Sequence, residues 1–374
     1  MGHGKVMLAF LIVMHYATAK TNVNTISEMF HHKGTLQQVE LGKVVLYLKQ
    51  APTINVRSTS DGRYHELILG LPAMHLEKKW LSFKAEQYDQ HHVMLYTVHL
   101  NKGHHKHEIE LVIRYDAQRV VPEYALFDSI SQKKGLVVVF HNKELLDHIQ
   151  RNERGALRVA ACTKPSVVID PGHGGHDSGA LDNAHLCEKD IVLAIGKQVV
   201  QLLSCNGITS YLTREDDSFV ALDERTTFAN ERDALLVSIH VNTSNREKAS
   251  GIETFYAPHT LLRNKTLSDP AYSDTIDSMR AALSENSRSL ADTIHACVMQ
   301  EIHNICKDVC DRRVKHSVGQ VLLGTSKPSV IVEVGFLSNQ KEKELLASIE
   351  YRTAAARGIA RGIIACIPMH VQSF

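Results

Sequence analysis

The sequence predicts a small all-β, sandwich-like domain followed by an α/β domain with a mostly parallel sheet of about six strands flanked by helices. Two observations favour the α/β domain. Continuous apolar runs at 167–169, 235–239 and 330–332 indicate strands buried on both faces, and an apolar stripe with helical spacing follows the first run. The all-β domain is favoured by short alternating segments, separated by Gly, Pro and Asn turns, in the first part of the chain.

The first residues have the pattern of a signal peptide, which we assign to residues 1–19. Lys5 supplies a positive charge, the apolar run 6–14 is too short to span a bilayer, and Ala17-Thr-Ala matches a cleavage site. We therefore expect an exported protein, periplasmic or secreted, without a stable membrane anchor.

Residues 25–145 are expected to form the all-β domain. Its strands are indicated by short apolar or alternating segments at 44–48, 64–69, 92–96, 108–113 and 135–140. Several short strands separated by turns favour a sandwich. The polar, Arg-rich residues 146–164 are the expected linker, so the α/β domain would occupy residues 165–374.

The composition is that of an ordinary globular chain. A length of 374 residues is long for a single core, which supports two domains. The formal net charge of +1 provides no basic field of the kind that binds nucleic acid, so no nucleic-acid partner is expected. The seven cysteines include at least one free thiol because their number is odd, and their pairing does not follow from the sequence.

Three predicted strands of the α/β domain end in a metal ligand or a proton carrier. The run 167–169 leads into Asp170-Pro-Gly-His173-Gly-Gly, the run 235–239 ends at His240, and the run 330–332 ends at Glu333. A lone histidine at a strand end is more often structural, and the chain has 23 histidines. However, the carboxyl ends of parallel strands meet at one edge of a sheet, where ligands gather. The presence of His173, His240 and Glu333 at three strand ends therefore predicts a functional site at this edge of the sheet.

Glu188 is the fourth member of this set. It precedes an amphipathic helical stripe formed by Ile191, Ile195, Val199 and Leu202, so it lies in the first turn, where the helix dipole favours a carboxylate. Two histidines and one glutamate are a recurring ligand set of catalytic Zn²⁺, which leaves one position for water. The predicted ligands are thus His173, Glu188 and His240, and Glu333 is free to act as general base and acid.

The motifs resemble those of the zinc-dependent N-acetylmuramoyl-L-alanine amidases, which cut bacterial peptidoglycan. The resemblance covers about residues 165–368 and includes the blocks around His173, Glu188, Thr213-Arg214, Arg225, Ser238-Ile-His240-Val-Asn242 and Glu333-Val-Gly-Phe-Leu-Ser-Asn. It implies that His173, Glu188 and His240 bind one Zn²⁺ and that Glu333 is the general acid and base. Arg225 and Asn242 are expected to position the substrate or the ligands rather than to bind the metal.

The resemblance implies hydrolysis of the amide between N-acetylmuramic acid and L-alanine, which would cleave stem peptides from glycan strands during septum splitting or wall remodelling. The all-β domain resembles, in position and strand pattern, the family's N-terminal domain that targets peptidoglycan at division sites. Two alternatives stay open. A zinc peptidase or carboxypeptidase acting on stem peptides could use the same ligands, and a catalytically silent wall-binding scaffold would lack a ligand or the catalytic glutamate.

An insertion at about 258–288 is expected within the α/β domain. It contains Pro270 followed by apolar residues at helical spacing, and three acidic residues that could reach the open zinc position: Asp274, Asp277 and Glu285. Family members that act in cell division carry a similar insertion, a helix that blocks the site until an activator protein withdraws it. The alternative is a surface loop without this role.

Overall fold

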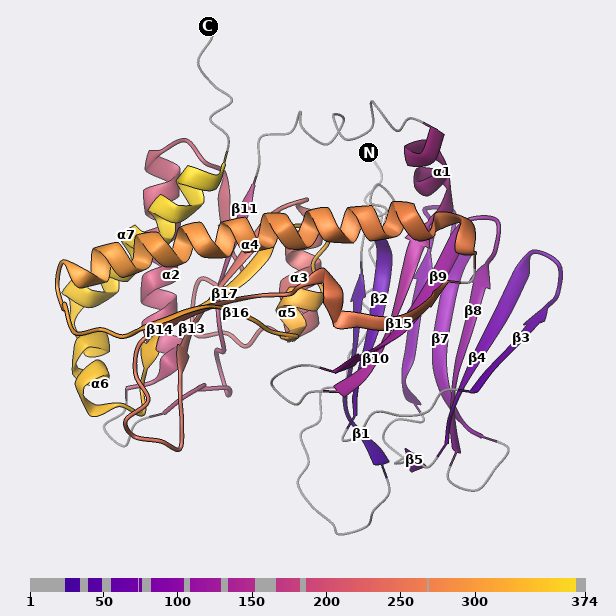
Figure 1. Cartoon of the computed structure of the whole chain (residues 1–374), viewed down its shortest axis with the longest axis horizontal. Coiled ribbons are helices and arrows are strands. Elements are labelled where there is room, and N and C mark those ends of the chain that lie inside the picture. The colour runs from indigo at the N-terminus through magenta and orange to yellow at the C-terminus, as the bar shows by residue number, and fades with distance from the viewer. Residues whose placement is uncertain are drawn as a thin grey trace, which may run out of the picture. The chain divides into compact units, whose positions relative to one another are not determined.

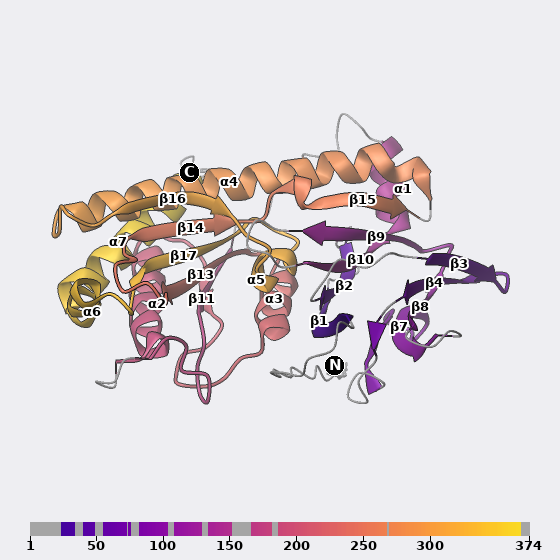
Figure 2. The ribbon, with the colours of Figure 1, turned by 60° about the horizontal axis from the view of Figure 1, so that its bottom comes forward.

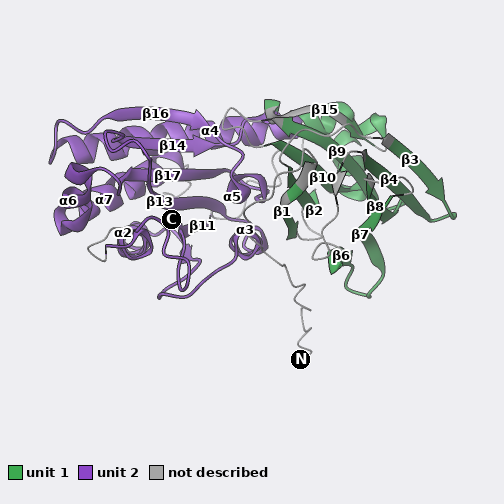
Figure 3. Cartoon of the chain, turned by 90° about the horizontal axis from the view of Figure 1, so that it is seen from below, with its two compact units in different colours: residues 1–156, 260–277 green, residues 157–259, 278–374 purple. Residues whose placement is uncertain are grey.

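The computed structural model describes residues 24–33, 40–48, 55–72, 74–75, 82–103, 108–128, 134–151, 166–181, 186–267 and 269–367. The chain divides into two compact units (Figure 3): Met1–Ala156 with Thr260–Asp277, and Leu157–His259 with Ser278–Phe374. The expected signal peptide, 1–19, lies outside the described residues. Of the expected linker, residues up to 151 belong to helix α1 (Lys143–Arg151), and the remainder lies outside the described residues.

The first unit contains two sheets with mostly antiparallel pairing (Figure 1). One has the order β15 (Leu262–Leu267), β9 (Val120–Asp128), β10 (Lys134–Asn142), β2 (Glu40–Leu48), β1 (Asn24–Lys33), β5 (Met74–His75). The other has the order β3 (Asn55–Ser60), β4 (Tyr64–Pro72), β8 (Glu108–Asp116), β7 (Met94–Lys102), β6 (Lys84–Tyr88). Buried residues of both sheets form one core, which includes Leu46, Leu69, Val98, Leu111 and Val138. The predicted all-β, sandwich-like region is confirmed.

The expected insertion forms elements of regular structure, part of which belongs to the first unit. Strand β15 pairs antiparallel with β9, although the two strands lie more than 130 residues apart in the chain. The short helix η4 (Pro270–Tyr272) follows, and the Gln150 amide donates to the Ala271 carbonyl at 2.8 Å. The Tyr272 hydroxyl donates to Asp147. These contacts fix the segment against β9 and α1.

The second unit is built on one six-stranded sheet (Figures 1 and 2). Its order is β12 (Ser210–Leu212), β11 (Val167–Pro171), β13 (Leu235–Asn242), β17 (Ser329–Phe336), β14 (Ile252–Tyr256), β16 (Asp311–His316). Every neighbouring pair is parallel except β14 with β17. The predicted mostly parallel sheet is therefore confirmed, and it is buried on both faces as its apolar runs indicated.

Helices cover both faces of this sheet. One face packs against α2 (Glu188–Cys205), α7 (Ile349–Cys366) and the later turns of α4 (Ser273–His303), and the other against α3 (Leu222–Glu231) and α5 (Gln320–Leu323). Helix α6 (Gln340–Ala347) also belongs to this unit, whereas the short η3 (His259–Leu261) lies where the chain passes into the first unit. None of the helices in the described part of the chain combines the length and apolar character needed to cross a membrane.

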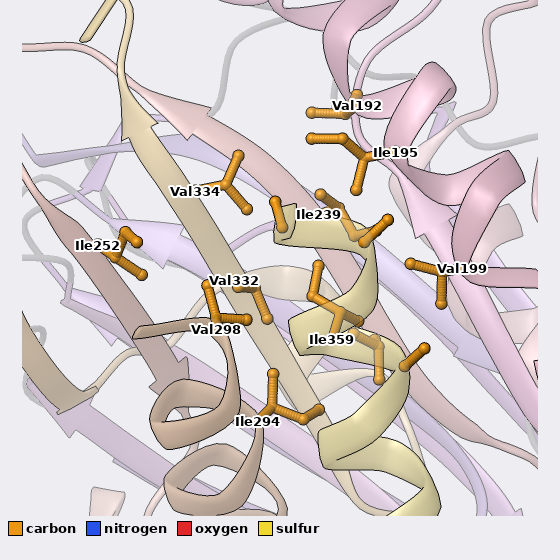
Figure 4. Packing of buried hydrophobic residues seen from close by; sticks show 14 of the residues in the cluster. Val192, Ile195, Val199, Ile239, Ile252, Ile294, Val298, Val332, Val334 and Ile359 are labelled. Atoms are coloured by element: carbon orange, nitrogen blue, oxygen red, sulfur yellow. The ribbon is translucent and has the colours of Figure 1, made fainter. Parts of the chain in front are cut away.

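The larger core layer is made of interdigitating Val and Ile side chains (Figure 4), among them Val192, Ile195, Val199, Ile239, Val332, Val334 and Ile359. Helices α4 and α7 approach closely in this layer because two glycines face α4. A Cβ at Gly358 would lie 2.5 Å from Val298 Cα, and one at Gly362 would lie 2.5 Å from Ile294 Cα. The second half of α4 is thus a core helix of the second unit.

Candidate active site

The strand register places three functional side chains in one row. His240 of β13 pairs with Glu333 of β17, and Glu333 pairs with Glu253 of β14. Directly paired residues on neighbouring strands point to the same face of a sheet. The row therefore lies on the face covered by α3 and α5, close to the carboxyl ends of β13 and β17. This is the edge at which the sequence predicted a site.

His173 is carried by a loop with an uncommon backbone conformation. Its φ is +60°, and the next two residues, Gly174 and Gly175, have φ of +129° and +58°. A non-glycine residue in this region costs about 1 to 2 kcal/mol, so the surroundings must hold it. Arg225 does so by donating to the carbonyls of Pro171 at 2.9 Å and His173 at 2.8 Å.

Arg225 is held in turn by a buried carboxylate. Asp170 accepts hydrogen bonds from Arg225 at 2.6 Å, Thr213 at 2.6 Å and Ser238 at 2.7 Å. Burial alone would raise the pKa of Asp170, but the Arg225 charge and these hydrogen bonds lower it below its ordinary value. Because Arg225 is only 2% exposed, its contacts serve the His173 loop and leave no surface for the substrate. Of its two expected roles, the structure supports the positioning of a ligand.

The three predicted metal ligands converge. His173 Nε2 lies 3.1 Å from Glu188 Oε1, and His240 Nδ1 lies 3.0 Å from the same oxygen. One ligand atom from each residue lies within 4.8 Å of the other two. The ligands come from the loop after β11, the first residue of α2 and the carboxyl end of β13.

Glu188 is fixed by the backbone around it. Its Oε1 accepts the Val241 N–H at 2.9 Å, and its Oε2 accepts the Ala180 N–H at 2.8 Å. Burial raises the pKa of Glu188, but the hydrogen bonds and charges of the two histidines outweigh burial and lower that pKa well below its ordinary value. Glu188 is therefore ionised, as a metal ligand must be.

The surroundings of the three ligands fit a zinc ion. Asp177 Oδ2 lies 2.8 Å from His173 Nδ1, which orients the ring and leaves Nε2 for the metal. No side chain fits into the space beside the ligands, because a Cβ at Gly179 would lie 2.5 Å from Glu188 Oε2 and one at Gly172 would lie 2.2 Å from His240 Cε1. Two imidazoles and one carboxylate are a ligand set of catalytic zinc.

Glu333 lies beside this cluster with one oxygen unused. Its Oε2 is buried and has no hydrogen-bond partner among the described residues. Burial, followed by the nearby carboxylates of Glu188 and Glu253, raises the pKa of Glu333 well above its ordinary value. A buried carboxyl group beside the metal ligands is placed to act as general base and acid.

Sequence reasoning missed Asp177 and Glu253. Asp177 follows His173 by four residues in a Gly-rich loop, which was a usable signal. Glu253 is a lone acidic residue in a short strand, and its partners come from other strands. The Asn242 amide donates to it at 2.6 Å and Arg312 Nε donates at 2.8 Å. Asn242, expected to position the substrate or a ligand, thus holds the carboxylate opposite Glu333.

The structure places Glu285 away from the metal ligands, at which it was expected to act. Ser287, two residues later on α4, accepts the Ser329 N–H at 3.3 Å. Ser329 is the first residue of β17, and Glu333 lies about 13 Å further along that strand. Glu285 is therefore exposed at the amino end of β17, whereas the ligands gather at the opposite edge of the sheet.

The other two acidic residues that were expected to reach the zinc position belong to the first unit. Asp274 and Asp277 lie in the first turns of α4, and both are exposed. They continue directly into the core part of the same helix. The pattern that predicted a separate inhibitory helix is thus the beginning of α4.

Comparisons with known proteins point to one family. The family model of N-acetylmuramoyl-L-alanine amidases matches residues 167–365. The uncharacterised protein YqiI of Bacillus subtilis is 37% identical over 216 residues, which cover 56% of this chain and 91% of that protein. The amidase AmiA of Escherichia coli is 32% identical over 219 residues, which cover 54% of this chain and 75% of that protein.

A solved structure of amidase AmiC2 from Nostoc punctiforme is 35% identical, with a TM-score of 0.44, and the match covers 54% of this chain and 97% of that one. The family model alone spans more than half of the 374 residues. It also includes His173, Glu188, His240 and Glu333, the residues that form the site. The chain therefore belongs to the N-acetylmuramoyl-L-alanine amidase family of hydrolases.

Proposed function

We propose that this protein uses one zinc ion to hydrolyse the amide bond between N-acetylmuramic acid and L-alanine in peptidoglycan, which releases stem peptides from glycan strands. One observation carries the proposal: His173, Glu188 and His240 converge within 4.8 Å. Beside them, the buried Oε2 of Glu333 has no partner among the described residues. Hydrolysis of an unactivated amide by a metal enzyme needs a set of metal ligands and an adjacent group that transfers protons.

The residues of the site have two roles, metal binding and proton transfer. His173, Glu188 and His240 would hold the zinc ion, which when bound polarises the scissile carbonyl and lowers the pKa of water. Glu333 takes a proton from the attacking water at its free Oε2 and returns it to the leaving amine of L-alanine. A pKa above the ordinary value makes the Glu333 carboxylate a stronger base for the first transfer.

A zinc peptidase or carboxypeptidase acting on stem peptides is the main alternative, since it could use the same ligands. The products separate the two. Purified peptidoglycan should be digested with the zinc-loaded full chain, and the released peptides identified by mass. An amidase releases complete stems that begin with L-alanine and leaves the glycan strands intact. Release of shortened stems or single residues alone would contradict the proposal.

A catalytically silent wall-binding scaffold is disfavoured because the site retains the three metal ligands and the proton carrier that hydrolysis needs. All three ligands and Glu333 are present at one sheet edge, and Asp177 and Arg225 hold the His173 loop. A scaffold has no need to retain these buried polar groups, each of which costs free energy to desolvate. Absence of any released product from zinc-loaded protein would favour the scaffold.

We also propose that the protein is exported and acts in the bacterial cell envelope, periplasmic or secreted, in septum splitting or wall remodelling. The predicted signal peptide, 1–19, supports export. The first unit is the candidate wall-targeting module, because every catalytic group belongs to the second unit. A fluorescent fusion lacking residues 20–145 should lose its septal or wall localisation, and unchanged localisation would refute the targeting role.

Control by an activator protein is a separate proposal. We place the action of an activator outside residues 271–286, because Ser287 contacts Ser329 at the amino end of β17 and α4 continues into the core. We propose that any activating protein acts on another element of the second unit. Activation of a variant in which residues 271–286 are unchanged but cross-linked to α1 would support this, and its absence would oppose it.

A further inference from the structure

A hollow of about 510 Å³ lies next to the catalytic row, on the side of Glu253. Its lining comes from the end of β13, the loop after it, β14, β16 and the end of β17, and includes Asn242, Arg246, Lys248, Glu253, Arg312 and Phe336. None of these residues is a metal ligand. The hollow is thus a separate feature beside the site, and its chemistry differs from that of the site.

The lining carries a positive charge. Arg246, Lys248 and Arg312 contribute three cations against one carboxylate, Glu253. That carboxylate is buried and already satisfied, because Arg312, Lys315 and Asn242 all donate to it. Arg246 and Lys248 are exposed, and no carboxylate among the described residues forms an ion pair with either. The surplus charge is therefore available to an anionic ligand.

Arg312 is fixed in a position suited to binding. Its guanidinium lies over the Phe336 ring, 4.8 Å from the centroid, and its Nε donates to Glu253 at 2.8 Å. Its two terminal amino groups donate to no described residue, and the side chain is 32% exposed. The Arg312 side chain is already ordered by these contacts, so binding a carboxylate at its two terminal amino groups would cost little further side-chain entropy.

The separation between the hollow and the metal ligands can be spanned by a short extended peptide. Glu253 lies one strand from Glu333 and two strands from His240, which corresponds to about 5 Å and 10 Å. An extended peptide advances about 3.3 Å per residue, so the hollow is reached within the first three residues of a bound chain. A glycan strand made of N-acetylated sugars is neutral once its lactyl carboxyl is in the amide. The stem peptide, by contrast, carries free carboxylates.

A second hollow, of about 570 Å³, lies on the other side of Lys248. It is lined by Ala180 and Leu181 from the ligand loop and by residues that follow β17, including the exposed Lys341 and the half-buried Lys343. Arg312 of the first hollow, by contrast, is held both by stacking on Phe336 and by the buried Glu253. The first hollow is the better carboxylate site.

We propose that the hollow bounded by Arg246, Lys248 and Arg312 binds a carboxylate of the stem peptide on the leaving-amine side of the scissile bond. This rests on the proposed amidase function and names the part of the substrate that the enzyme selects. Arg312 donates to the carboxylate, while Arg246 and Lys248 attract it. The enzyme accordingly prefers stems whose carboxylate near L-alanine is free over stems in which that group is amidated.

The test compares two soluble muropeptides that differ only in the carboxylate of the second stem residue, free in one and amidated in the other. The zinc-loaded parent should show a kcat/KM about 10- to 100-fold higher on the free form, as expected for a charge-assisted contact. In the double variant Arg246→Gln/Lys248→Gln, kcat/KM on the free form should fall several-fold and the preference should shrink. An equal loss on both substrates, or no loss, overturns the proposal.

A matched control removes the same charge elsewhere. Lys197 and Lys307 are exposed, and neither lines the hollow. Lys197→Gln/Lys307→Gln should keep the parent's preference between the two muropeptides. Because removal of Arg312 could unfold the protein by leaving Glu253 with fewer partners, Arg312→Lys serves as the second variant. It keeps the charge but loses the planar fork, so the preference should fall while the thermal midpoint stays close to the parent's.

A binding experiment separates failure of the subsite from failure of the amidase proposal. The free stem peptide, as the leaving product, should be titrated by calorimetry into the Glu333→Gln protein with free or amidated second-residue carboxylate. Tighter binding of the free form, lost in Arg246→Gln/Lys248→Gln, supports the subsite even if no amide is cleaved. Equal binding of both forms overturns it even if the amidase is active.

Discussion

Gly179 offers a sharp test of where the metal ligands are. Its φ is +64°, and a Cβ added there would lie 2.5 Å from Glu188 Oε2 and 2.6 Å from His173 Cδ2. Gly207 has nearly the same backbone, with φ of +70°, but an added Cβ would meet nothing within 4 Å. The two glycines therefore separate backbone strain from collision with the ligands.

Both substitutions to alanine should lower the free energy of unfolding by about 1 to 2 kcal/mol, because both force a side chain into the left-handed region. Only Gly179→Ala should also displace Glu188 and His173. Ordinary carbon contacts begin near 3.4 Å, so the ligands would have to move by almost 1 Å. We expect its zinc affinity to fall about 10- to 100-fold, the range found when groups that orient metal ligands are removed.

The assay is a competition titration of zinc against a chromophoric chelator, combined with denaturant unfolding of the metal-free proteins. Gly207→Ala should bind zinc like the parent in spite of its lower stability. If Gly179→Ala bound zinc as tightly as Gly207→Ala, the metal ligands would not surround position 179.

Two further predictions concern Glu333 and the segment that belongs to the first unit. The pKa of Glu333 is raised in the folded protein, so the folded protein keeps a proton that the unfolded chain releases. The free energy of unfolding therefore falls as pH rises from the ordinary glutamate pKa towards the pKa of Glu333 in the folded state. Metal-free Glu333→Gln should therefore be more stable than the parent at pH 7 to 8 and equal to it near pH 4, and parallel denaturation curves at both pH values would contradict this. Replacing residues 262–272 with a Gly/Ser linker should leave β9 as an open edge of its sheet, so the backbone amides of β9 should exchange hydrogen faster. The rate of peptidoglycan hydrolysis should not rise. A faster enzyme would instead show that the replaced residues inhibit the parent.

The sequence predicted the core of the site because each group lies at a place defined by a local pattern. His240 and Glu333 end continuous apolar runs, and Glu188 begins an amphipathic helix. Such positions are recognisable without knowledge of what packs against them. The fold class of both units followed from the same periodicities.

The parts that sequence reasoning missed depend on contacts between distant segments. Glu253 gains its importance from Arg312, which lies 59 residues later, and from its register opposite Glu333. Strand β15 is polar and pairs with β9, so no apolar pattern marked it. The helical spacing after Pro270 was genuine, but the helix continues to His303 and becomes part of the core.

In the proposed mechanism, Glu188 holds the metal while Glu333 moves the proton. It is tested most directly by measuring bound zinc and peptidoglycan hydrolysis for two matched carboxylate-to-amide variants, Glu188→Gln and Glu333→Gln. We expect Glu333→Gln to retain zinc at the parent's stoichiometry with hydrolysis reduced at least about 100-fold, whereas Glu188→Gln should lose both. Loss of zinc from Glu333→Gln together with its retention in Glu188→Gln would contradict the account.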